Sequence, residues 1–413
     1  MRRALAFLLV LAATTARADD FGLRDGDRVV FYGDSITDQR LYTTFAETFA
    51  VTRYPDRDMS FIHSGWGGDR VGGGGGGPVD RRLFRDVIAY RPTVVTVMLG
   101  MNDASYRAFD DKIFETYSKG YRHLVGKLKE ELPGVRLTLI EPSPYDDVTR
   151  EPKFDGGYNA VLMRYGQFIK ELAGEQGAVV ADLNTGVVEA LKKAQAADKA
   201  TSEKLIADRV HPGPGGQLLM AGELLKAWHA PSVVSTVKIE AREGKVVETA
   251  NTEVTGFARG DSITWTQLDA ALPMPIDMKD PVVALAMSSS DFVKSLNQQV
   301  LAVALPEAGS CVLKIDGEEI GTFSRDQLAD GLNLAMLNTP MSRQAAEVHK
   351  LTLKHTAIHN KRWRDVQVPL QDEAGPALNK ALAALDELEA DVVKRQRAAA
   401  HPKPHKFELT QKK

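Results

Sequence analysis

The sequence predicts an α/β protein in which helices cover both faces of a parallel β-sheet. Between residues 28 and 228, short apolar runs alternate with longer helical patterns, which is the order of elements in a parallel sheet with crossover helices. The apolar runs are continuous, as expected of strands buried on both faces. The chain has 413 residues, 43% of them hydrophobic and 26% charged, which is typical of a globular protein with a sizeable core.

Five runs rich in Val, Ile, Leu and Phe are the candidate strands of this sheet. They lie at residues 29–32, 60–63, 94–99, 137–140 and 178–181. Helical patterns lie between and after them, at residues 41–50, 79–89, 113–131, 158–174 and 215–228. Together they predict a first domain over residues 22–230.

The pattern changes after this domain. Residues 233–241 and 245–249 alternate between apolar and polar, and Asp316-Gly317 marks a hairpin turn. We therefore expect a β-rich accessory module over residues 232–335. The pattern of residues 336–413 predicts a helical C-terminal region, which we expect to end in a polar tail or strap from residue 401.

The first 18 residues have the pattern of a signal peptide. Arg2 and Arg3 precede an apolar stretch, and Ala16-Arg17-Ala18 fits the small-residue cleavage pattern. The stretch is too short for a transmembrane helix, which needs about 20 apolar residues. We expect cleavage after Ala18 and export to a periplasm or the cell exterior, without a stable membrane anchor.

The composition also bears on possible partners. The net charge of −3 gives a nucleic-acid partner no electrostatic support. No set of residues stands out as a metal site, so neither a metal nor another cofactor is expected. The composition does not fix the oligomeric state.

Polar residues gather where the predicted strands end, and again after the last strand. Four blocks carry them: Gly33-Asp34-Ser35-Ile36-Thr37, Gly67-Gly68-Asp69, Gly100-Met101-Asn102-Asp103 and Asp208-Arg209-Val210-His211. Ligands of open parallel sheets bind beyond the carboxyl ends of the strands. If the strand order is 2-1-3-4-5, the first three blocks lie side by side at one edge.

These residue types suit acyl transfer. A Ser hydroxyl needs a base to take its proton, and His211 is a candidate, since an ordinary imidazole has a pKa near about 6.5. Asp208 can orient the Nδ1–H group of His211 and leave Nε2 for Ser35. The backbone N–H groups of Ser35 and Gly68 and the amide of Asn102 could stabilise an oxyanion.

The four blocks, in this order, resemble those of the SGNH hydrolases, also called GDSL-like lipases and esterases. The resemblance covers residues 22–230 and implies a flavodoxin-like three-layer αβα sandwich. It also implies metal-free hydrolysis of carboxylic esters by Ser35, His211 and Asp208, with an oxyanion hole formed by Ser35, Gly68 and Asn102. The chain departs from the family at residues 72–77, a glycine run that could be a flexible insertion or a lid.

The family includes carbohydrate acetylesterases, lysophospholipases and thioesterases. We expect short acyl groups, especially acetyl, on a small molecule or carbohydrate, and the other two activities are the nearest alternatives. A binding protein that uses the β-rich module, with Trp265 as its one tryptophan, is the alternative of another class. The candidate pocket residues are Gln39, Arg40, Trp66, Met101, Asp103 and Tyr106.

Two of these observations have competing interpretations. Trp66 could stack on a sugar ring or pack in the core. The letters of the first block recur at Gly260-Asp261-Ser262-Ile263-Thr264, but no matching later blocks follow. We therefore interpret Ser262 as part of a β-strand and not as a nucleophile.

Overall fold

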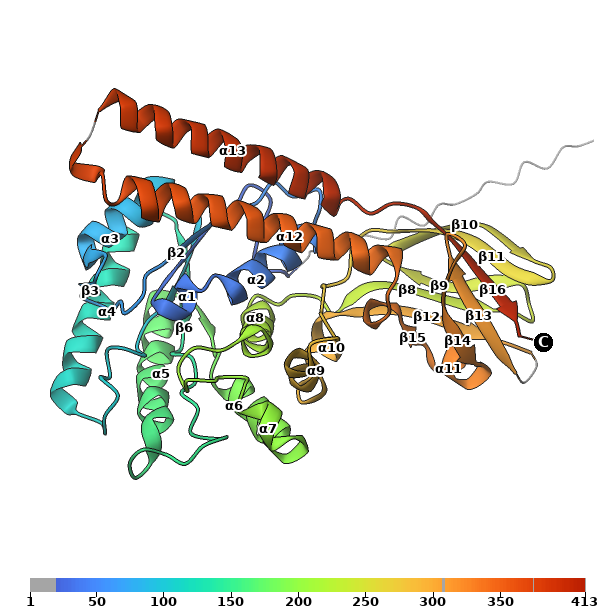
Figure 1. The fold of residues 1–413 in the computed structure, drawn as a ribbon, viewed down its shortest axis with the longest axis horizontal. Helices are drawn as coiled ribbons and strands as arrows, with labels where there is room; N and C mark the ends of the chain where they lie inside the picture. Colours follow the sequence, from blue (N-terminus) through green and yellow to red (C-terminus); the bar gives the residue numbers. More distant parts are fainter. Residues whose placement is uncertain (1–19, 307–308, 374, 413) are drawn as a thin grey trace, which may run out of the picture.

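A computed structural model describes residues 20–306, 309–373 and 375–412. The predicted signal segment, residues 1–18, lies outside the described residues. Figure 1 shows the α/β part at one end of the molecule and the β-rich part at the other, with two long C-terminal helices running along the α/β part. Within the described ranges, no helix is long and apolar enough to cross a membrane.

A five-stranded parallel sheet forms the centre of the α/β part. Its strands are β1 (Arg28–Gly33), β2 (Ser60–Gly65), β5 (Val94–Met98), β6 (Arg136–Ile140) and β7 (Val179–Ala181). Their order is β2-β1-β5-β6-β7, and all four pairings are parallel. This is the order 2-1-3-4-5, and the predicted fold class is confirmed.

Helices join the strands and cover the sheet. They are α1 (Ser35–Asp38), α2 (Leu41–Arg53), α3 (Val79–Asp86), α4 (Asp111–Glu131), α5 (Gly157–Gln176), α6 (Thr185–Ala197), α7 (Lys199–Ser202) and α8 (Pro214–Ala227). Right-handed crossovers place helices on opposite faces where the strand order reverses. Accordingly α2 packs against α8, while α3, α4 and α5 pack in succession.

Two further sheets make up the β-rich part. One has the order β15-β12-β8-β9 and the other β10-β11-β16-β13-β14. Their strands are β8 (Val233–Glu240), β9 (Lys245–Ala250), β10 (Thr252–Arg259), β11 (Ser262–Asp269), β12 (Gln298–Ala304), β13 (Ser310–Ile315), β14 (Glu318–Ser324), β15 (Leu332–Asn333) and β16 (His405–Gln411). Asp316 and Gly317 both have positive φ between β13 and β14, which is the hairpin geometry expected there. Helices α9 (Pro281–Ser288), α10 (Phe292–Leu296) and α11 (Arg325–Asp330) complete this part.

The end of the chain differs from the expected polar tail. Strand β16 lies in the middle of its sheet, between β11 and β13. Phe407 and Leu409 alternate with polar residues and are buried, which is the period-two pattern of a strand with one face on the core. The ring of Phe407 stacks on Trp265 at a centroid distance of 5.0 Å. Trp265 is 1% exposed, so it offers no free face for stacking on a sugar.

The C-terminal helices dock on the α/β part through a buried network of polar side chains. Helices α12 (Pro340–Asn360) and α13 (Pro376–Ala400) form a hairpin, and α12 packs on α2 and β2. Glu47 of α2 lies at the centre of the network. Its Oε1 accepts hydrogen bonds from His355 Nε2 (2.6 Å) and Gln396 Nε2 (2.8 Å), and its Oε2 lies 3.0 Å from His63 Nε2.

The carboxylates of this network raise the pKa of one histidine, His355. Burial alone lowers the pKa of His355, but the carboxylates of Glu47 and Glu389 outweigh it and raise the pKa to about 9. Burial by itself raises the pKa of Glu389, but its bonds to His355 and His359 lower it to about 2. Removing one partner of a buried ion pair typically costs about 3–5 kcal/mol, so the network fixes the hairpin on the domain.

The raised pKa of His355 predicts a pH-dependent stability. The stabilisation is fully present below pH ~6.5, the ordinary imidazole value, and is lost as the pH rises through about 9. We expect the free energy of unfolding to fall over this range, and to fall less steeply in a His355→Asn variant. Urea unfolding at several pH values measures both slopes, and equal slopes would contradict the prediction.

The position of β16 predicts that the end of the chain is needed for folding of the β-rich part. A chain stopped after Ala400 leaves β11 and β13 without their shared neighbour. We expect limited proteolysis to cut the β-rich part of this variant rapidly. Stopping the chain after Gln411 is the matched control, since it keeps β16 whole. Equal resistance of the two truncated chains would show that β16 is dispensable.

Candidate active site

The site lies where β1, β2 and β5 end. In the parallel register, Gly33 of β1 pairs with Gly65 of β2 on one side and Met98 of β5 on the other. The loops that follow therefore leave the sheet at the same edge. This edge is where open parallel sheets bind ligands.

A tight turn after β1 positions Ser35. A Cβ atom on Gly33 would lie 2.2 Å from Thr37 Oγ1 and 2.8 Å from the Met98 carbonyl oxygen, so only glycine fits there. Asp34 caps α1, and its side chain accepts a hydrogen bond from the Ile36 N–H (3.0 Å). Ser35 is the first residue of α1 and is half-buried.

Two hydrogen bonds join Ser35, His211 and Asp208. His211 Nε2 lies 2.8 Å from Ser35 Oγ, and His211 Nδ1 lies 2.6 Å from Asp208 Oδ2. Asp208 Oδ1 also accepts the backbone N–H groups of Val210 (2.9 Å) and His211 (2.7 Å). Partial burial tends to raise the pKa of Asp208, but these bonds outweigh it and lower the pKa. A carboxylate therefore holds both the loop and the imidazole.

The loop that carries His211 is anchored by the loop after β6. Arg209 has a φ of 73°, in the left-handed region that non-glycine residues seldom adopt. Its side chain donates to the Glu151 carbonyl oxygen (2.8 Å), and its own carbonyl oxygen accepts the Asp146 N–H (2.9 Å). Strain of this kind persists where surrounding contacts enforce it, often at functional sites. No short motif in the sequence marks this anchor, so it could not be predicted from the residues alone.

The second and third blocks meet at Asn102. Its Nδ2 donates to the carbonyl oxygen of Asp69 (3.1 Å), and its Oδ1 accepts from the hydroxyl of Tyr106 (3.0 Å). These two hydrogen bonds fix the orientation of the Asn102 amide. They use one of its two N–H groups, so the other can donate to a bound molecule. Gly68, just before Asp69, is exposed and has a φ of 76°, which suits glycine.

Buried ionisable side chains lie beneath the second block and hold Asp69 in place. Arg82 of α3 is fully buried and pairs with Asp86 and with Asp69 Oδ2 (2.8 Å). Burial raises the pKa of Asp34 to about 7, that of Asp103 to about 6, and that of Asp69 as well. Arg82 is a second supporting residue that no sequence motif indicates, since an arginine inside a helix usually lies on the surface.

The structure corrects two of the predicted pocket residues. Met101 is 1% exposed and Asp103 is 7% exposed, so both lie beneath the site instead of lining it. The reason is local: the Met101 carbonyl oxygen accepts from the hydroxyl of Tyr158 (2.5 Å), and Asp103 Oδ1 accepts from the Val71 N–H (2.9 Å). These bonds turn the loop inward.

The other predicted pocket residues keep some exposure near the blocks. Gln39 accepts a hydrogen bond from Gln217 Nε2 (2.7 Å), which links α1 to α8. Arg40 has a φ of 58° and donates to the Asp38 carbonyl oxygen (2.9 Å). Tyr106 is exposed and contacts Asn102. These three side chains can therefore meet a bound molecule.

Trp66 is packed between other groups. The guanidinium carbon of Arg364 lies 3.3 Å from its ring centroid, so one ring face is covered. The glycine run folds into a small hairpin of β3 (Gly73–Gly74) and β4 (Gly77–Pro78). A Cβ on Gly76 would lie 2.7 Å from the Trp66 ring and 2.5 Å from Arg82 Cδ. Gly76 therefore has no room for a side chain, because the chain passes close to Trp66 at this position.

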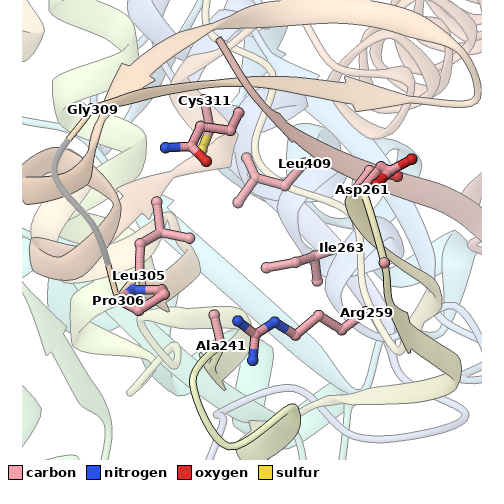
Figure 2. Close-up of a pocket in the computed structure, with 12 residues that line it drawn as sticks. Ala241, Arg259, Asp261, Ile263, Leu305, Pro306, Gly309, Cys311 and Leu409 are labelled. Atoms are coloured by element: carbon pink, nitrogen blue, oxygen red, sulfur yellow. The ribbon is translucent and has the colours of Figure 1, made fainter. Parts of the chain in front are cut away.

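The second copy of the first block lies elsewhere. Ser262 begins β11 and lines a cavity of ≈150 Å³ in the β-rich part. Figure 2 shows Ile263, Leu305 and Leu409 in this cavity with Arg259 and Asp261. The described residues that line it include no histidine, so Ser262 has no base there. Among the described residues, no group of three or more His, Cys, Asp or Glu side chains is arranged to hold a metal ion.

Comparison with known proteins places this site in a wider context. Residues 31–219 match the model of the GDSL-like Lipase/Acylhydrolase family. An acetylxylan esterase of Geobacillus stearothermophilus is 25% identical over 226 residues, which are 49% of this chain and 93% of that protein.

Solved structures extend the comparison. A gut microbial diltiazem-metabolizing enzyme has a TM-score of 0.81 at 25% identity, covering 94% of this chain and 98% of that one. An acetyl-xylooligosaccharide esterase from Geobacillus has a TM-score of 0.42 at 24% identity, covering 50% and 96%. The similarity to the diltiazem-metabolizing enzyme thus includes the β-rich part and the C-terminal helices.

The packing of the glycine run predicts a contrast between two of its positions. Gly76→Ala should destabilise the protein by about 1–3 kcal/mol, because the new methyl group overlaps Trp66 and Arg82. Gly72→Ala is the matched control, since a Cβ there meets nothing within 4 Å. Thermal unfolding of both variants measures the difference. Equal melting temperatures would mean that Gly76 does not pack tightly on Trp66.

Proposed function

We propose that the chain is an ester-hydrolysing enzyme, and specifically a serine esterase acting through Ser35, because residues 31–219 match the GDSL-like lipase/acylhydrolase family and an acetylxylan esterase is similar to the chain. The observation that carries the proposal is the pair of hydrogen bonds from Ser35 to His211 and from His211 to Asp208. A hydroxyl, an imidazole and a carboxylate in this order form the arrangement that activates a serine nucleophile.

The reaction has two halves. Ser35 Oγ attacks the ester carbonyl carbon while His211 Nε2 takes the proton of the Ser35 hydroxyl. Asp208 stabilises the imidazolium that results. The tetrahedral intermediate collapses, and the alcohol leaves with the proton from His211. Water, activated by the same imidazole, then attacks the acyl group and frees Ser35.

Three N–H groups are the proposed oxyanion donors. They are the backbone N–H groups of Ser35 and Gly68 and the amide of Asn102. The amide orientation fixed by Asp69 and Tyr106 supports this role for Asn102. Removing one such donor typically costs about 2.7–4 kcal/mol of transition-state stabilisation.

Among substrates, we favour short acyl esters, especially acetyl groups on carbohydrates. The matched acetylxylan esterase and the polar side chains of Gln39 and Arg40 at the site edge support this choice. A relative that matches nearly the whole chain is named for metabolising diltiazem, so small-molecule esters belong to the same proposal. Lysophospholipase and thioesterase activity are the alternatives that a substrate series tests.

Export is a separate part of the proposal. It is supported by the sequence of residues 1–18, with a basic start, an apolar stretch and a small-residue cleavage pattern. N-terminal sequencing of the mature protein would test it, with Asp19 as the expected first residue.

The central test uses p-nitrophenyl acetate, butyrate and palmitate. We expect turnover of the two short esters, and a loss of about 10⁴-fold or more in kcat in Ser35→Ala, because the nucleophile is removed. Ser262→Ala is the matched control, since this serine shares the surrounding five letters, and its activity should equal that of the unaltered chain. Equal activity in Ser35→Ala, or no turnover of any ester, would refute the mechanism.

A further inference from the structure

The turn between the two C-terminal helices reaches the proposed oxyanion loop, residues 66–69. Figure 1 shows this turn beyond the end of α12, at the same end of the molecule as α3. It contains η3 (Lys361–Gln367), a π-helical segment. Trp363 of η3 is buried, donates to Asp86 Oδ1 (2.6 Å) and meets the Trp66 ring edge-on at 5.7 Å. Through Trp363, the turn therefore packs against the α/β part.

Arg364, the next residue, contacts three groups around the loop. Its guanidinium carbon lies 3.3 Å from the Trp66 ring centroid, its NH1 lies 3.4 Å from the Gly65 carbonyl oxygen, and its NH2 lies 3.7 Å from Asp38 Oδ2. The side chain is only 24% exposed. A guanidinium over a tryptophan ring and next to a carboxylate combines cation–π and ionic attraction.

Asp38 connects this contact to the nucleophile. It lies three residues after Ser35 on α1, and its Oδ2 also accepts the Gly67 N–H (3.2 Å). Asp38 therefore ties the turn after β1 to the loop after β2, and Arg364 pairs with the same oxygen. Gly67 and Gly68 are exposed and have no side chains of their own to hold them.

The loop is consequently held at both ends by arginines. Arg82 binds Asp69 at its far end, from within the family domain. Arg364 covers Trp66 and pairs with Asp38 at its near end, from outside residues 31–219. Between these ends lies Gly68, the proposed backbone donor.

We propose that Arg364 is a positioning residue of the esterase, which holds residues 66–68 against Asp38 and so orients the N–H of Gly68 toward the oxyanion. The role of Gly68 in this statement rests on the proposed function. It follows that the C-terminal hairpin completes the active site. A displacement of about 1 Å in such a group can cost a factor of about 100 in rate.

The test compares Arg364→Ala and Arg364→Lys with Arg362→Ala in the full chain. Arg362 is the matched control, since it lies two residues away on η3, and its hydrogen bonds within the described part of the chain go to Asp386 of α13 (2.7 Å) and to Gln367 instead of the loop. With p-nitrophenyl acetate, we expect Arg364→Ala to lower kcat about ten-fold or more at nearly constant KM. Arg364→Lys should recover part of this loss, and Arg362→Ala should keep full kcat.

A second readout does not depend on activity. Hydrogen exchange of peptides covering residues 64–70 should be faster in Arg364→Ala than in the unaltered chain and unchanged in Arg362→Ala, because the Gly67–Asp38 bond opens more often. Unchanged exchange would overturn the proposal, even if the chain proved to have no esterase activity. A raised KM at constant kcat would also overturn it and make Arg364 a substrate contact.

A double-substitution cycle tests the route through Asp38. If Arg364 acts by way of this carboxylate, the loss in kcat for Asp38→Ala with Arg364→Ala should be clearly smaller than the product of the two single losses. Strictly multiplicative losses would contradict this route. Loss of ester turnover in Ser35→Ala, measured alongside, shows separately whether the proposed function holds.

Discussion

The parallel pairing of β1 between β2 and β5 is the constraint on which the site depends. Because all three strands run the same way and end in register at Gly33, Gly65 and Met98, the loops after them converge at one edge of the sheet. Gly33 has no room for a side chain there, so the chain turns at once into α1. This turn presents Ser35 at the same edge that the loop carrying His211 reaches from the far end of the domain.

A second constraint joins the C-terminal part to this arrangement. The buried carboxylate of Glu47 faces His63 from the sheet, His355 from α12 and Gln396 from α13. Such a carboxylate is tolerated only when hydrogen-bonded partners surround it, so the hairpin takes one position on the domain. That position brings Trp363 and Arg364 next to Trp66. The C-terminal turn and the loop after β2, which are far apart in sequence, are thereby brought into contact.

The sequence was informative wherever function or fold imposes a local pattern. Continuous apolar runs predicted the sheet, and the four blocks contain Ser35, Asn102 and His211, which the structure brings to one edge. Properties set by distant contacts could not be read in this way. Met101 and Asp103 belong to a block, yet hydrogen bonds to Tyr158 and Val71 turn them inward. Strand β16 has only a short alternation inside a polar segment, and its neighbours β11 and β13 lie far away in the chain. Arg364 has no motif, because its role follows from the docking of a hairpin.

The central claim is that Ser35 is the nucleophile, activated by His211. Labelling the protein with a fluorophosphonate and mapping the adduct by peptide mass spectrometry tests this most directly, since only an activated serine forms the adduct readily. The account predicts one adduct per chain, on the peptide that contains Ser35, and none in a His211→Ala variant. An adduct on the peptide that contains Ser262, or labelling that is unaffected by His211→Ala, would contradict it.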